Sequence, residues 1–348
     1  MKKIFALILA LAMVFALVAC GTTETTETAA EYKLGMGVIE SAASSATGNA
    51  QLDNTVAAVV TDAEGKIVMA RIDVAQNKMN VEGGAVDAAA AFQTKMELGD
   101  AYGMAPVGID NDGNGVTLEW YEQTKAFEAY VVGKTAAEVE VMELQEAGGH
   151  MIAVDTALLD AGCSMQITDF IAAVVKACND EQGVTFTAAG EFTLGVAAAT
   201  SAADSTAAAA DADGVVKMYG EYGAAVVADG KIIAALNDAN QPDITINVAG
   251  EIVEAKLKGT KRELKEAYGM APVAIDNDGN GVTLEWFEQS AAFSAYAVGK
   301  TAEELANLET QEVNAHFIST DAALLDAGCS IQIGGMGAVI ATAANYAR

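Results

Sequence analysis

The chain has 348 residues, of which 19 are basic and 48 acidic, and its formal net charge is −29. A surface this acidic repels phosphate backbones and anionic lipid headgroups, so we expect no nucleic-acid partner and no basic membrane-binding face. The length is enough for two or three domains that each bury an ordinary core.

The N-terminus has the layout of a bacterial signal peptide. Two lysines precede an apolar run at residues 4–15, which is too short for a membrane-spanning helix. The letters LVAC that end at Cys20 resemble the lipobox of bacterial lipoproteins, in which cleavage leaves a lipidated cysteine. The resemblance implies a signal peptide at 1–19, a lipidated Cys20 with a flexible tether at 20–30, and attachment to the extracytoplasmic face of the bacterial cell membrane. An ordinary secretory signal with a chance cysteine is the alternative.

The rest of the chain contains an internal repeat. Residues 101–164 recur at 267–330 without a gap, and roughly 45 of these 64 positions are identical. We therefore expect two homologous domains, at 31–182 and 183–348.

Each copy is expected to start with strands. Residues 55–61 and 66–72 are rich in β-branched residues and are joined by a turn sequence, and residues 224–228 and 231–236 are joined at Asp-Gly, which favours a tight hairpin. Although this region differs between the copies, both keep Gly-Lys-Ile followed by an Asp-x-x-Gln motif. These four polar residues are candidate ligand contacts, and capping of the strand end is the alternative: Asp73, Gln76, Asp238 and Gln241.

Helices follow the strands. Capping boxes start at Thr94, Thr135, Thr260 and Thr301. Aromatic spacing predicts amphipathic helices over 119–132 and 285–298, and further helices are expected at 167–177 and 333–344. Strands followed by helices predict an α+β protein with two homologous domains, each an antiparallel sheet with helices packed on one side.

An acidic loop in each copy matches the first six positions of an EF-hand calcium loop. The twelfth position should be a bidentate glutamate but holds Tyr121 or Phe287. The sequence therefore leaves two interpretations, a calcium site or a plain acidic turn. The candidate ligands are Asp110, Asp112, Asn114, Asp276, Asp278 and Asn280.

Both histidines of the protein belong to the repeat, and each is followed by a cysteine at the same spacing. The pairs are His150 with Cys163 and His316 with Cys329. A Cys/His pair is typical of a nucleophile with its base or of half a metal site, and a purely structural role is the alternative. With Cys20 lipidated, three cysteines remain, and an odd number argues against a disulfide framework.

A glycine, a cysteine and a serine precede the last helix of each copy, and this motif carries a second resemblance. Together with the Gly-Lys-Ile strand, it resembles the FMN-binding domain of cell-envelope redox proteins, in which a Gly-Ala-Thr segment carries FMN bound covalently through its phosphate. The resemblance implies that Gly162, Ser164, Gly328 and Ser330 lie at the phosphate, with Ser in place of the acceptor Thr. Trp120 and Trp286, with Tyr102 and Tyr268, are candidates for the wall that faces the flavin ring, and for the tryptophans a place in the core is the alternative.

Two functions follow as expectations. The first is a lipid-anchored extracytoplasmic protein with two FMN-binding-like domains, a flavin carrier in cell-envelope electron transfer with redox or surface protein partners. The second is a cofactor-free surface lipoprotein that binds a small solute, calcium or a protein partner. A hydrolytic enzyme ranks third, because no set of nucleophile, base and orienting residue is visible beyond the Cys/His pairs.

Overall fold

A computed structural model of the chain describes residues 29–108, 110–273 and 276–348. The expected signal peptide at 1–19, Cys20 and the tether as far as residue 28 lie outside the described residues. Among the residues that are described, no helix is both long enough and apolar enough to cross a membrane.

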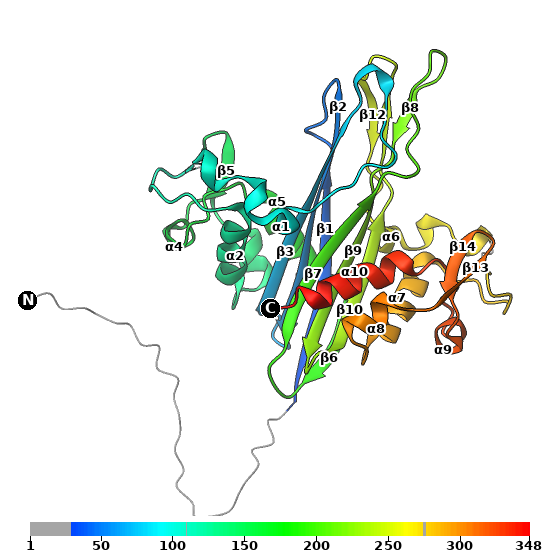
Figure 1. The fold of residues 1–348 in the computed structure, drawn as a ribbon. Coiled ribbons are helices and arrows are strands. Elements are labelled where there is room, and N and C mark those ends of the chain that lie inside the picture. Colours follow the sequence, from blue (N-terminus) through cyan, green and yellow to red (C-terminus); the bar gives the residue numbers. More distant parts are fainter. Residues whose placement is uncertain (1–28, 109, 274–275) are drawn as a thin grey trace, which may run out of the picture.

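Two antiparallel sheets form the centre of the molecule (Figure 1). The first has the order β3-β2-β1-β6, with β1 Ala30–Ser41, β2 Asn49–Asp62, β3 Ile67–Asn80 and β6 Val184–Ala188. The second has the order β10-β9-β7, with β7 Thr193–Ser201, β9 Tyr219–Ala228 and β10 Lys231–Asn240. The expected hairpins are confirmed, and in the first copy both strands extend well beyond the predicted runs.

Three small sheets complete the strands. One has the order β12-β11-β8 and consists of β8 Gly214–Val216, β11 Asp243–Ile246 and β12 Ile252–Lys256. The other two are hairpins, one in each copy: β4 Leu144–Ala147 with β5 His150–Ala153, and β13 Thr310–Val313 with β14 His316–Ser319.

The helices occur as matching sets in the two copies. The first set is α1 Lys95–Leu98, α2 Trp120–Val131, α3 Ala136–Glu140, α4 Thr156–Asp160 and α5 Thr168–Cys178. The second is α6 Lys261–Leu264, α7 Trp286–Ala297, α8 Ala302–Ala306, α9 Ala322–Asp326 and α10 Gly334–Asn345. Short 3-10 turns lie at η1 Glu82–Gly84, η2 Gly99–Tyr102, η3 Ala105–Val107, η4 Lys265–Tyr268 and η5 Ala271–Val273. All four predicted capping boxes are present and start α1, α3, α6 and α8.

The two sheets pack face to face, and helices cover the outer face of each. Because side chains alternate along a strand, Val56, Ala58 and Val60 of β2 point into the core between the sheets, whereas Ala57 and Val59 pack against helices. Figure 1 shows the helices of the first copy on the left of the sheets and those of the second copy on the right. The α+β class with antiparallel sheets and packed helices is thus confirmed.

Glycines let the last helix of each copy lie directly on its sheet. A Cβ atom at Gly35 of β1 would lie 1.9 Å from the carbonyl oxygen of Ala177 in α5. At the equivalent Gly195 of β7, it would lie 1.8 Å from the carbonyl oxygen of Ala343 in α10. The same close approach in both copies fixes the position of the helix that carries part of each cavity described below.

The two copies are joined by backbone pairing and by a buried ion pair. Strand β6, which follows the expected domain boundary at residue 182, pairs with β1 of the first copy. Arg262 in α6 of the second copy donates to Asp180 of the first at 3.0 Å, and both side chains are at most 10% exposed. The domain division itself stays a prediction.

Candidate functional site

Each copy contains a half-open cavity between its helices and its sheet, and in the second copy a further cavity of about 320 Å³ shares part of its lining. The cavity of the first copy has a volume of about 470 Å³ and that of the second about 430 Å³. Eight lining positions hold the same residue in both copies: Gln76/Gln241, Lys95/Lys261, Tyr102/Tyr268, Met104/Met270, Asn111/Asn277, Trp120/Trp286, His150/His316 and Gln166/Gln332. The Gln76, Lys95 and Gln166 positions lie outside the near-identical block 101–164, so their identity is not explained by the identity of that block.

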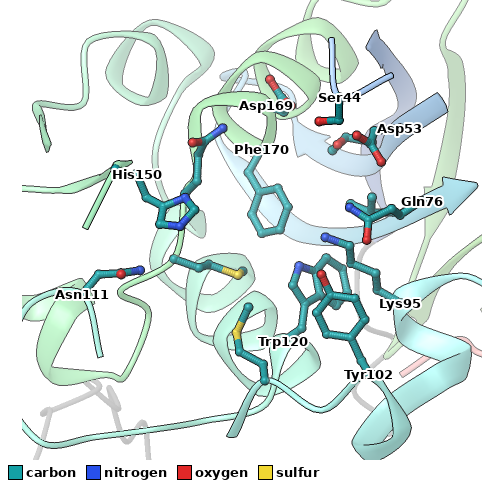
Figure 2. A pocket seen from close by; sticks show the side chains of 16 residues that line it. Ser44, Asp53, Gln76, Lys95, Tyr102, Asn111, Trp120, His150, Asp169 and Phe170 are labelled. Carbon is teal, nitrogen blue, oxygen red and sulfur yellow. The ribbon is translucent and has the colours of Figure 1, made fainter. Parts of the chain in front are cut away.

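A lysine lies on two aromatic rings in each cavity. The capping box of α1 places Lys95 at the first helical position, from which its ammonium lies 4.9 Å from the ring centre of Tyr102 and 5.5 Å from that of Trp120. Figure 2 shows these three side chains lying together. Lys261 repeats the arrangement at 5.0 Å from Tyr268 and 5.2 Å from Trp286. Such contacts stabilise a desolvated ammonium by roughly 1–2 kcal/mol.

The two tryptophans line the cavities and also belong to the core. Trp120 is 2% exposed and packs edge to face on Phe170 at 5.8 Å, and Trp286 is 4% exposed. The lysine covers the tryptophan on the cavity side, so the partly exposed Tyr102 offers a ligand more ring surface than Trp120 does. The tryptophan therefore forms the floor of the cavity.

The two residues of the Asp-x-x-Gln motif that both copies share have different roles: the aspartate is structural, and the glutamine lines the cavity. Asp73 accepts hydrogen bonds from the backbone N–H groups of Val74 at 2.7 Å and Met96 at 3.1 Å, and Asp238 accepts in the same way from Ala239 and Arg262. These carboxylates hold the start of α1 and α6 against the sheet. The glutamines line the cavities, where the Tyr268 hydroxyl donates to Gln241 at 3.1 Å. Asp238 also lines the second cavity.

Burial raises the pKa of both motif aspartates to about 6, from a usual value of 3.8. The folded state therefore holds protons on these groups between about pH 4 and pH 6, where the unfolded chain has released them. The free energy of unfolding should fall as pH rises through this window, by on the order of 2–3 kcal/mol for each group. We expect Asp73→Asn with Asp238→Asn to flatten this slope relative to the wild type in urea unfolding at pH 4 to 7. An unchanged slope would contradict the shifted values.

The Gly-Cys-Ser motif lies behind the cavity wall. Ser164 and Ser330 are each 2% exposed, and the cavity is lined instead by the next residues, Met165 and Ile331. The backbone N–H groups of Ser164 and Met165 both donate to the side-chain oxygen of Gln123 at 3.0 Å. The backbone donors expected for a phosphate are therefore taken by a protein side chain.

The glycines of this motif have a structural reason to be glycine. Gly162 has a φ of +93° and Gly328 a φ of +89°, which place both in the left-handed region. A Cβ atom at Gly162 would lie 2.4 Å from Leu118, and one at Gly328 would lie 2.5 Å from Leu284. Close packing and the turn after α4 and α9 account for both positions.

The geometry fits the ring of FMN better than its phosphate. The Tyr102 ring and the amides of Gln76 and Gln166 suit the face and polar edge of a flavin. The lining of the first cavity includes Asp53 and Asp169 against the single cation Lys95, and that of the second includes three carboxylates against one lysine. This charge opposes a phosphate, and the buried serines do not fit a covalent phosphoester.

The acidic loops are closed by their own hydrogen bonds. The Asp110 carboxylate accepts from the backbone N–H groups of Asn114 at 3.1 Å and Gly115 at 2.9 Å, and Asp276 repeats this pattern. In the described part of the chain, no three His, Cys, Asp or Glu side chains gather closely enough to hold a metal ion. These bonds of Asp110 and Asp276 are typical of an acidic turn, whereas one carboxylate oxygen of Asp112 and one of Asp278 are buried without a hydrogen-bond partner among the described residues. Calcium binding stays a prediction of the sequence.

If the loops are plain acidic turns, calcium should not stabilise the protein. Because calcium needs six to eight oxygen ligands and the Asp110 oxygens already accept backbone bonds, 5 mM calcium chloride should leave the melting temperature unchanged within about 1 °C. Magnesium chloride at equal ionic strength is the control. A rise specific to calcium that Asp110→Asn and Asp276→Asn abolish would establish the loops as calcium sites.

The Cys/His pairs are separated by burial. His150 and His316 are exposed at the cavities, whereas Cys163 and Cys329 are fully buried. Burial raises the pKa of both thiols to about 12, so they stay protonated and do not act as nucleophiles at neutral pH. The structural reading of the cysteines is the one that the geometry supports.

Two charged residues of each cavity were not predicted from the sequence: a lysine, Lys95 or Lys261, and a carboxylate, Asp169 or Glu221. Lys95 and Lys261 were present in the predicted capping boxes but were not recognised as site residues. Asp169 and Glu221 occupy positions that differ between the copies, so comparing the copies alone could not point to them.

The chain matches no protein-family model and no solved structure. The chlorophenol reductase of Desulfitobacterium hafniense is 37% identical to it over an alignment 100 residues long, which covers 25% of this chain and 28% of that protein. The chain is thus distantly similar to part of that protein. Since the match covers little more than a quarter of the relative's length, nothing about the rest of that protein follows from it.

Proposed function

We propose that the chain is a lipid-anchored binding protein on the extracytoplasmic face of a bacterial membrane, with two equivalent cavities that each hold one small polar ligand. Lys95 or Lys261, the two glutamines and the tyrosine of each cavity are the contacts. The observation that carries this proposal is the recurrence of eight lining residues in two cavities, three of them outside the near-identical block 101–164.

A scaffold role alone accounts less well for this recurrence. A core position tolerates exchange among apolar residues of similar volume, as Met165 and Ile331 illustrate at one wall position. The asparagine has a structural bond in both copies, because its amide donates to the backbone carbonyl oxygen of Ser164 or Ser330. A lysine and two glutamines at a half-open cavity contribute little to a core. Their common property is the ability to donate hydrogen bonds to a bound molecule.

A flavin is the second candidate ligand. The resemblance to FMN-binding domains implies it, and the partial similarity to a protein named as a reductase agrees with redox chemistry. A bound flavin would supply that chemistry, while Tyr102 and the glutamine amides would orient its ring and polar edge. Noncovalent binding is the form that the buried Ser164 and Ser330 allow.

The experiment is a ligand screen on the full chain by thermal shift, with amino acids, sugars, riboflavin and FMN at millimolar concentration, accompanied by intact mass and visible spectra. We expect a rise in melting temperature with one ligand class and no FMN-sized mass increment. A ligand at 100 times its Kd stabilises by about 2.7 kcal/mol, which is easily measured. If no ligand shifts the melting temperature, the proposed function is wrong.

A further inference from the structure

Each cavity contains a carboxylate that interacts electrostatically with the lysine and accepts no hydrogen bond from a described residue, and the two copies place it on different elements. In the first cavity it is Asp169 of α5, and in the second it is Glu221 of β9. The strand position equivalent to Glu221 is Thr55: Thr55 precedes the Val56/Asp73 pair as Glu221 precedes the Tyr222/Asp238 pair. The acid has therefore moved from helix to strand.

The exchange is sterically complementary. The position equivalent to Asp169 is Gly335 in α10, and a Cβ atom there would lie 1.6 Å from the Glu221 carboxylate. The Glu221 carboxylate thus fills the space in which the Asp169 side chain begins. The copies thus differ at two positions, Asp169/Gly335 and Thr55/Glu221, and both keep one carboxylate in the same part of the cavity. Two unrelated substitutions would not be expected to preserve it.

Among the described residues, neither the cavity lysine nor this carboxylate has a direct partner of opposite charge. Lys95 and Lys261 form no ion pair with any described residue, and no described group donates a hydrogen bond to Asp169 or Glu221. Each carboxylate nevertheless feels the charge of its lysine, and burial raises the pKa of both acids. In Figure 2, Asp169 stands apart from Lys95. Opposite charges that share a cavity without touching leave room for a molecule between them.

The other charged groups at the cavities do not repeat between the copies. Asp53 lines only the first cavity and accepts from the Gln51 amide at 2.8 Å. Asp204 and Asp238 line only the second cavity, and Asp238 is engaged by backbone N–H groups. The shared charge pattern is one lysine and one unpartnered carboxylate.

We propose that each cavity binds a small zwitterion of the α-amino acid class, its carboxylate at Lys95 or Lys261 and its ammonium at Asp169 or Glu221. This inference rests on the proposed function and specifies its ligand. A zwitterion satisfies both partly buried charges and adds no net charge to an acidic cavity, whereas an anion or a cation satisfies only one. The glutamine amides contact the remaining polar atoms.

The test is a thermal-shift screen of the twenty protein amino acids on the full chain, followed by calorimetric titration of the strongest. N-acetyl and C-amide forms with the same side chain are the matched probes, since each removes one charge. We expect an amino acid to bind and both blocked forms to bind at least about 10-fold more weakly, because hydrogen bonds between charged groups are lost. Equal binding of either blocked form would overturn the inference.

Variants test the role of the carboxylate. Asp169→Asn should weaken binding about 10-fold or more at the first cavity, and Glu221→Gln should do so at the second. Asp169→Gly should also lose binding at the first cavity, and adding Thr55→Glu to it should restore binding, because this pair rebuilds the second cavity's arrangement. A purely structural carboxylate would alter melting of the free protein without this rescue.

The outcomes separate the inference from the proposed function. If riboflavin, FMN or a sugar binds and no amino acid does, the inference is wrong and the binding function stands. If an amino acid binds equally to wild type and to the carboxamide variants, the carboxylate role is wrong. If nothing binds, both fail.

Discussion

Arg262→Ala should destabilise the protein by about 3–5 kcal/mol, because it leaves Asp180 as an uncompensated buried charge between the two copies. The Arg262 guanidinium donates to both carboxylate oxygens of Asp180, at 3.0 and 3.2 Å, and to the carbonyl oxygen of Gln182 at 2.8 Å. Asp180 also accepts from the backbone N–H of Met36 in β1 at 3.1 Å. Loss of the arginine therefore weakens a network that holds α6 against the first sheet.

Urea unfolding at neutral pH measures this effect. The matched control is Lys265→Ala, which removes a neighbouring ion pair with Glu181 whose side chains are 41% and 83% exposed. That variant should change the free energy of unfolding by no more than about 1 kcal/mol. If Arg262→Ala costs as little as this control, the buried network does not hold the copies together.

Lys95→Met and Lys261→Met should each weaken ligand binding strongly at one cavity, and the double variant should weaken it at both. Methionine keeps most of the apolar contact with the aromatic rings but removes the ammonium, which is the only basic side chain common to both cavities apart from the exposed histidine. Because the lysine contributes a charge-assisted hydrogen bond to the ligand, the expected loss is about 1.5–3 kcal/mol, a factor of about 10 to 100 or more in Kd.

The control for these variants is Lys125→Met. The Lys125 ammonium lies 4.9 Å from the ring centre of Tyr121, so it has the same kind of cation–π contact but does not line either cavity. It should bind ligand as the wild type does. If the Lys95→Met, Lys261→Met double variant binds ligand with wild-type affinity, the lysines do not contribute to the binding site.

Much of the fold could be predicted from local patterns. The capping boxes at Thr94 and Thr260 fixed the starts of α1 and α6, because side-chain and backbone groups three residues apart satisfy each other locally. The hairpin turns and the aromatic spacing of α2 and α7 are equally local signals. The pairing of β6 with β1 was not predictable in this way, because it joins segments about 150 residues apart.

The candidate site was predictable only in part. Gln76, Trp120 and their equivalents were expected at a ligand and do line the cavities. The sequence pattern predicted an accessible hydroxyl at Ser164. The structure buries it behind Met165, because α5 packs closely on the sheet at Gly35, and this packing is not visible in the local sequence. The cavity carboxylates could not be predicted, because Asp169 and Glu221 reach equivalent places in the two cavities from different elements, a helix and a strand. Only three-dimensional packing shows that these places are equivalent.

Native mass spectrometry of the full chain, with the amino-acid pool, riboflavin and FMN as probes, tests the central claim of two equivalent cavities most directly. The predicted result is a series of complexes with one and two copies of the same ligand, in which Lys95→Met or Lys261→Met removes the second copy. A chain that never holds more than one copy, or a second copy that persists in the double variant, would contradict the assignment of the two cavities as equivalent binding sites.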